Sequence, residues 1–288
     1  ASLADLLAFA AIPSVSAQVQ HAPDMQRAAD WLSGRLRQAG LEVVEQWPTA
    51  GHPAVYAEWL QAPGAPTILI YGHYDVQPPD PLGRWHSPPF TPTVREERVY
   101  GRGVSDDKGP LLIAVQVADA YLSAAGRLPV NVRFLFEGEE EVGSAHLPAL
   151  IRERRARLTA DFVLSADGGM WSAETPSLTV RARGLAALEF TVRGPAKDLH
   201  SGRHGGSLHN PLHAAAALVA SLHGPDGRVA VEGFYDGVQD RSEAERAAVQ
   251  ALPFTDEAYL EQTGAPAPYG EAGYSRSEEH TSELQSPY

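Results

Sequence analysis

Acidic and histidine side chains follow three apolar segments of this 288-residue chain, at the point where each segment ends. The three groups are His73 with Asp75, the run from Glu137 to Glu141, and Asp167. Imidazole and carboxylate groups bind divalent metal ions and also act as general acids and bases. Carboxylates gathered in one place repel one another unless cations neutralise them. If the three groups meet in space, they therefore predict a metal site.

A fourth group, residues 101–109, contains the doublet Asp106 and Asp107 at the start of an expected helix. Taken singly, each group has an ordinary structural explanation. His73 could be a core histidine, either aspartate of the doublet could cap the helix, and the other carboxylates could be solvated. The combination of the four groups is what favours metal chemistry.

The composition restricts the chemistry and the partners that we expect. The chain has no cysteine, so a metal site must use His, Asp and Glu, and disulfides and thiolate sites are excluded. A net charge of −13 argues against nucleic acid or an anionic membrane surface as a partner. No apolar run approaches the roughly 20 residues of a membrane span. The first residues also lack a basic region before an apolar core, which favours a cytoplasmic protein.

Strands and helices alternate in the part of the chain that must position these groups. Apolar patterns predict strands at residues 41–44, 54–60, 67–71, 130–136 and 161–165, and helices at residues 24–37, 107–125 and 147–158. Gly40 and Gly126 stand where two of these helices should stop, and residues 77–92 form a Pro-rich loop. The alternation predicts an α/β fold, a three-layer α/β/α sandwich around a largely parallel sheet. Ligands bind outside the carboxyl ends of strands in such sheets, so the acidic groups should converge.

The pattern changes near residues 174–177, where we expect a domain boundary. Beyond it we expect strands at residues 178–183 and 185–192 and an Ala-rich helix at residues 211–222. The predicted division is residues 1–176, residues 177–275, and a polar tail of residues 276–288. The tail has no apolar period and resembles a translated sequencing adapter, so it takes no part in the fold prediction.

Four motifs resemble those of M20 peptidases in type, order and spacing. They are residues 72–78 (GHYDVQP), 101–110 (GRGVSDDKGP), 140–144 (EEVGS) and 198–202 (DLHSG). The resemblance is strongest to the dipeptidase branch, which includes carnosine dipeptidases. It implies hydrolysis of the peptide bond in dipeptides or small peptides at a site with two divalent metal ions, usually zinc, with manganese or cobalt as alternatives. It also implies a catalytic first domain and an incomplete α+β lid domain, through which the full-length protein forms a homodimer.

The resemblance further implies which residues bind the two metal ions. Asp106 would bridge them. His73 and Asp167 would complete the first site, and Glu141 would bind the second metal ion.

Three other residues receive catalytic roles from the same resemblance. Asp75 would orient the imidazole of His73. Glu140 would be the general base, which activates the metal-bridging water and passes its proton to the leaving amine. His200 would hold the substrate or the developing oxyanion, reaching in from the other subunit of the dimer.

The remaining candidates receive no role in the chemistry. Asp107 has none in the family pattern and is expected to cap the helix that follows it, while His204 and His209 are expected to be loop or surface residues. Family members are longer, and a segment beyond the lid carries a histidine that completes the second metal site. His280 lies in the adapter-like tail and is not expected to replace that histidine. The chain as written is therefore expected to be inactive.

Two alternative functions remain open at this point. The same site could deacylate N-acyl amino acids, because both reactions hydrolyse an amide and only the substrate pocket distinguishes them. A non-catalytic family member that binds peptides would be expected to have a degraded metal site. Every ligand that a chain of this length can contain is present here, as is the base Glu140, which favours an enzyme.

Overall fold

The computed structural model describes residues 2–168, 175, 177–179, 187–239, 242–253 and 255–270. The chain divides into two compact units, Ala1–Thr179 and Val180–Tyr288. In the described part of the chain, no helix is both long and apolar enough to span a membrane. Residues 276–288, which were predicted to be a polar, adapter-like tail, lie outside the described residues.

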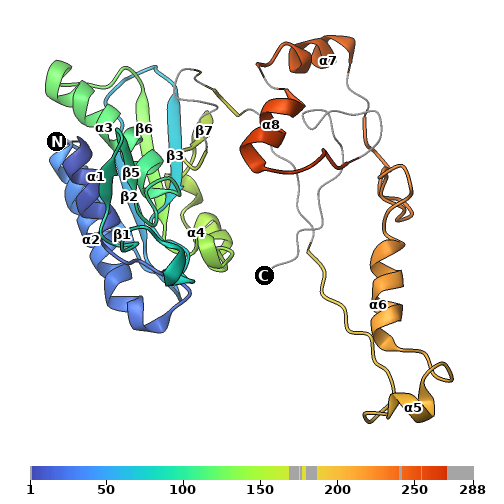
Figure 1. Ribbon diagram of the computed structural model, residues 1–288. Coiled ribbons are helices and arrows are strands. Elements are labelled where there is room, and N and C mark those ends of the chain that lie inside the picture. The colour runs from blue at the N-terminus through green and yellow to red at the C-terminus, as the bar shows by residue number, and fades with distance from the viewer. Residues whose placement is uncertain are drawn as a thin grey trace. The chain divides into compact units, whose positions relative to one another are not determined.

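The first unit is built on a five-stranded sheet in the order β1-β2-β6-β3-β7 (Figure 1). The strands are β1 (Val43–Trp47), β2 (Ala54–Trp59), β3 (Thr67–His73), β6 (Asn131–Glu137) and β7 (Phe162–Ser165). β3 runs parallel to both β6 and β7, whereas β2 is antiparallel to both β1 and β6. The sheet is therefore mixed, and only the part that carries the acidic groups is parallel as predicted. β1 and β2 are antiparallel because the connection of residues 48–53 is too short for a crossover.

Helices cover both faces of this sheet, which confirms the predicted α/β sandwich. They are α1 (Ser2–Ala10), α2 (Ala22–Gln38), α3 (Lys108–Ala125) and α4 (Leu147–Glu153). As predicted, α2 and α3 are followed by Gly40 and Gly126, whose φ angles of 92° and 65° suit glycine. α4 is shorter than predicted, because a 3₁₀ turn, η4 (Arg155–Arg157), follows it.

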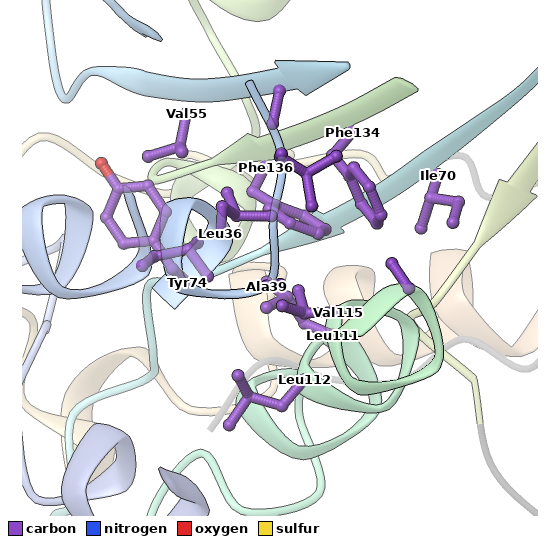
Figure 2. Close-up of a cluster of buried hydrophobic side chains, with 14 of the residues drawn as sticks. Leu36, Ala39, Val55, Ile70, Tyr74, Leu111, Leu112, Val115, Phe134 and Phe136 are labelled. Atoms are coloured by element: carbon purple, nitrogen blue, oxygen red, sulfur yellow. The ribbon is translucent and has the colours of Figure 1, made fainter. Parts of the chain in front are cut away.

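Neighbouring strand residues point to opposite faces and enter two separate apolar clusters. The larger cluster contains Phe134 and Phe136 of β6, packed with residues of α2 and α3 (Figure 2). The smaller cluster contains Leu135, between those two residues, and Leu150 of α4. Burial of each such side chain contributes about 1.5–3 kcal/mol, so the two clusters fix the sheet between its helices.

Shorter elements complete the first unit. They are the 3₁₀ turns η1 (Val19–His21), η2 (Leu82–Arg84) and η3 (Glu140–Val142) and the hairpin of β4 (Thr93–Arg95) and β5 (Arg98–Tyr100). The hairpin follows the loop of residues 77–92, which was predicted to be irregular and contains no strand.

The second unit contains four helices among its described residues. They are α5 (Ser201–His204), α6 (Pro211–Ala220), α7 (Glu243–Gln250) and α8 (Asp256–Thr263). α6 confirms the predicted Ala-rich helix. Residues 187–192 do not form the predicted strand, and residues 180–186 lie outside the described part. A strand requires a partner backbone, and Leu188 is 92% exposed, so the apolar pattern alone did not produce one.

Candidate metal centre

The predicted groups meet at one edge of the sheet because β3, β6 and β7 are parallel. His73 is the last residue of β3 and is in register with Glu137, the last residue of β6. Glu140 follows β6 in η3, and Asp167 lies two residues beyond the end of β7. These carboxyl ends form the edge at which ligands bind in α/β sheets.

His73 lies at the centre of the site. Its Nε2 lies 2.9 Å from Oδ1 of Asp106 and 3.8 Å from Oδ2 of Asp167. These three residues each offer one ligand atom, and the three atoms lie within 4.8 Å of one another. His73 is fully buried, whereas the side chains of Asp106 and Asp167 are 65% and 39% exposed. One imidazole nitrogen and two carboxylate oxygens around an open position fit a divalent metal ion with room for a further ligand.

Asp75 supports His73 from behind. The carboxylate is fully buried, and its Oδ1 lies 3.3 Å from Nδ1 of His73. It also accepts hydrogen bonds from the backbone N–H groups of Glu140 (3.2 Å) and Glu141 (3.1 Å). One carboxylate thus contacts the histidine and the loop that carries both glutamates, which is the geometry required of a residue that orients a metal ligand.

The two glutamates have different surroundings. Oε2 of Glu140 lies 4.0 Å from Nε2 of His73, so this carboxylate faces the site. The Glu141 carboxylate accepts a hydrogen bond from Nε2 of Gln77 over 2.8 Å and is not part of the three-residue group. The assignment of Glu141 as a metal ligand stays a prediction. Gln77 lies in the motif of residues 72–78, and its contact with Glu141 was not expected from the sequence.

The structure confirms the predicted place of Asp107 at the start of the helix but not a capping role of its side chain. Asp107 occupies the N-cap position of α3, but its side chain makes no capping hydrogen bond. Its Oδ2 instead accepts a hydrogen bond from the backbone N–H of His73 over 3.1 Å. A Cβ atom at Gly72 would lie 2.6 Å from this oxygen, so the glycine permits the close approach. The sequence feature that could have indicated this contact is Gly72, because only a glycine leaves room for the Asp107 oxygen there.

Charge in the site favours bound cations. Burial lowers the pKa of His73, but the carboxylates of Asp75, Asp107 and Asp106 outweigh it and raise the pKa to about 10. Burial also raises the pKa of Asp107 to about 7. Protons and a metal ion therefore compete for the same groups, and binding of a metal ion releases protons.

Burial likewise raises the pKa of both glutamates, and neighbouring carboxylates add to the effect. For Glu140 these neighbours include Glu141 and Asp167, while His73 acts in the opposite direction. For Glu141 the main neighbour is Asp106, and the hydrogen bond from Gln77 opposes the rise. A carboxylate whose pKa is raised is a better proton acceptor when ionised, which suits a general base.

His200 belongs to the second unit. It is exposed, and its Nδ1 accepts a hydrogen bond from the backbone N–H of Gly202 over 3.0 Å at the start of α5. His204 and His209 are exposed, as expected. His200 and the metal centre belong to different units, and the role of His200 stays a prediction.

Comparison with known families gives a match over most of the chain. The model of peptidase family M20/M25/M40 matches residues 69–279. The chain belongs to this family. The membership agrees with the four motifs and with the group of His73, Asp106 and Asp167. Members of this family are metallopeptidases that use divalent metal ions.

Relatives of this M20 chain include proteins named as dipeptidases. The Cys-Gly metallodipeptidase dug1 of Schizosaccharomyces pombe is 34% identical over 267 residues, which is 88% of this chain and 56% of the relative. The Beta-Ala-His dipeptidase of Homo sapiens is 34% identical over 209 residues, which is 72% of this chain and 41% of the relative. The chain thus spans about half the length of these relatives.

A solved structure has the same fold. The M20 family metallo-carboxypeptidase Sso-CP2 of Sulfolobus solfataricus is 32% identical, with a TM-score of 0.76. The alignment covers 96% of this chain and 61% of that protein.

Proposed function

We propose that this chain carries the catalytic site of a metallopeptidase that hydrolyses the peptide bond of dipeptides or small peptides. The observation that supports this proposal best is the group of His73, Asp106 and Asp167 at the carboxyl edge of the sheet. The similarity to the two dipeptidases supports the choice of substrate class.

The metal complement that we propose is two divalent ions, zinc in the first place and manganese or cobalt as alternatives. His73, Asp106 and Asp167 would hold the first ion, and Asp106 together with Glu141 would contribute to the second. When bound, such ions lower the pKa of water from 15.7 to about 7 and polarise a carbonyl group.

Glu140 is the residue that we assign as general base. Its carboxylate faces the site, 4.0 Å from Nε2 of His73, and its pKa is raised by burial. Oε2 would accept a proton from the nucleophilic water and later deliver it to the leaving amine. Asp75 would keep the His73 imidazole aligned throughout, because the Asp75 carboxylate is buried and hydrogen bonded.

The second unit would supply further groups. We propose that it forms a lid and a homodimer contact, and that His200 of one subunit binds the substrate at the site of the other. A cytoplasmic location is part of the same proposal. The lid, the dimer contact and the role of His200 rest on the family resemblance of residues 198–202 and of the chain as a whole.

Two measurements test the proposed function. The first is metal binding by the 288-residue chain, measured by competition with a chromophoric chelator for Zn²⁺, Mn²⁺ and Co²⁺. The second is hydrolysis by the complete gene product of a panel of dipeptides and of matched N-acetyl amino acids. Metal-dependent cleavage of dipeptides supports the proposal, whereas cleavage of the N-acetyl compounds alone would assign a deacylase. Peptide binding without metal binding would assign a non-catalytic family member.

A further inference from the structure

A serine far from the motifs contacts the support of the metal centre. Ser16 lies between α1 and η1, and its Oγ donates a hydrogen bond to Oδ2 of Asp75 over 2.6 Å. Oδ2 of Asp75 also accepts a hydrogen bond from the backbone N–H of Glu141. Oδ1 of Asp75 lies 3.3 Å from Nδ1 of His73. Among the described residues, Ser16 is the hydroxyl donor to this fully buried carboxylate.

The segment that carries Ser16 is itself held in place. The buried Ser14 donates from its Oγ to the backbone carbonyl of Tyr74 over 2.7 Å, and its own carbonyl accepts from the N–H of Val76 over 2.9 Å. The two hydrogen bonds join Ser14 to Tyr74 and Val76, the residues directly before and after Asp75. They hold Ser16 against the continuation of β3, so its hydroxyl reaches Asp75 from a fixed direction.

A buried lysine also holds this segment in place. Nζ of Lys108 donates to the carbonyl of Ile12 over 2.7 Å and to that of Phe9 over 3.1 Å. Lys108 begins α3, two residues after Asp106. The segment of residues 12–16 is thus bonded to two of the three sequence regions that supply the group of His73, Asp106 and Asp167.

We propose that Ser16 is a positioning residue of the metal centre, acting through Asp75 on His73. The inference rests on the proposed function, because it assigns a support to that site. A serine hydroxyl bonded to one carboxylate oxygen limits rotation of the carboxylate, which keeps the other oxygen directed at the imidazole. The family match begins at residue 69, so Ser16 lies outside the matched residues.

The test is the Zn²⁺ affinity of the chain, measured by chelator competition at a fixed pH. Removal of an outer partner of a metal ligand typically weakens metal binding about 10–100-fold. Ser16 lies one contact beyond Asp75, so we expect Ser16→Ala to weaken binding about tenfold, at the lower end of that range. Ser16→Thr keeps the hydroxyl and should bind Zn²⁺ as the parent chain does.

Ser123→Ala is a matched control. Oγ of Ser123 donates to Oδ1 of Asp119 over 3.0 Å on the exposed side of α3, so this variant also removes a serine–aspartate hydrogen bond. It should leave Zn²⁺ affinity unchanged. All variants are compared for the thermal unfolding midpoint of the metal-free chain, so that a loss of fold is separated from a loss of affinity.

A double-mutant cycle tests the route through Asp75. In an Asp75→Ala background, Ser16→Ala should change the Zn²⁺ affinity less than about twofold, because the acceptor is already absent. A tenfold effect in both backgrounds would overturn the positioning role. If Asp75→Ala does not fold, the Zn²⁺ affinities of Ser16→Ala and Ser16→Thr are compared instead. Equal affinities of these two variants would overturn the positioning role of Ser16.

The outcomes also separate this inference from the proposed function. If the parent chain binds none of Zn²⁺, Mn²⁺ and Co²⁺, that result overturns both the proposed metal site and the proposed role of Ser16. A parent chain that binds Zn²⁺, together with a Ser16→Ala variant that binds equally well, overturns only the role of Ser16.

Discussion

The affinity of the chain for Zn²⁺ should rise about tenfold per pH unit between about pH 7.5 and 8.5, because a metal ligand must lose its proton before it binds. His73 is the group concerned. Burial lowers its pKa, but the carboxylates of Asp75, Asp107 and Asp106 raise it to about 10. Below that pH the imidazole carries a proton that competes with the metal ion, so affinity increases as pH rises.

The size of the effect distinguishes the perturbed histidine from an ordinary one. With an unperturbed pKa of about 6.5, His73 would be about 90% neutral already at pH 7.5, and affinity would change by about a tenth up to pH 8.5. With a pKa of about 10, the imidazole stays mostly protonated across this interval. Each pH unit then changes the binding free energy by about 1.4 kcal/mol.

The assay is chelator competition at half-unit steps of pH, corrected for the protonation of the chelator itself. Asp75→Asn is the matched variant, because it removes the charge of the carboxylate that raises the His73 pKa most. Its slope should be shallower than that of the parent chain. A parent curve that is flat above about pH 7.5 would refute the reasoning, since it would mean that His73 is already neutral or is not a ligand.

Three further predictions concern the base, the ligands and the core. Glu140→Gln in the complete gene product should retain its metal ions and lose about 10²–10⁴-fold in turnover. Dipeptide hydrolysis and metal content are the measurements. Loss of the metal ions would contradict the role of Glu140 as general base. Asp106→Ala should lower the occupancy of two metal ions and Asp167→Ala mainly that of one, measured by titration, and equal mild effects would argue against a bridging Asp106. Leu32→Ala, in the fully buried core, should lower the free energy of unfolding by about 2–5 kcal/mol in denaturant titrations. Leu3→Ala, at a side chain that is 49% exposed, should cost much less, and equal losses would contradict the burial of Leu32.

Much of the fold followed from local patterns. The apolar spacing in α2 buries Met25, Ala28, Ala29 and Leu32 on one face, as a 3.6-residue period requires. β3 was predicted from its apolar residues alone. The pairing of β2 with both neighbours in antiparallel orientation was not predicted, because strand direction depends on which strands meet, and the apolar pattern of a single strand does not contain that information.

The sequence by itself determined which side chains could bind metal and roughly where they would gather. The absence of cysteine limits the ligands to His, Asp and Glu, and His73, Asp106 and Asp167 each lie near the end of a predicted strand or the start of a predicted helix. Ligands bind at the carboxyl edge of a parallel sheet, and this rule predicted from the sequence alone that these residues lie close together.

Only the tertiary structure decided how the site is supported. Asp107 bonds to the backbone of His73, 34 residues away, and Ser16 bonds to Asp75, 59 residues away. A hydrogen bond forms only when donor and acceptor lie about 3 Å apart in a suitable direction. Residue type and spacing identify groups that can donate or accept, but the packing of α1, α3 and β3 decides which of them come within that distance.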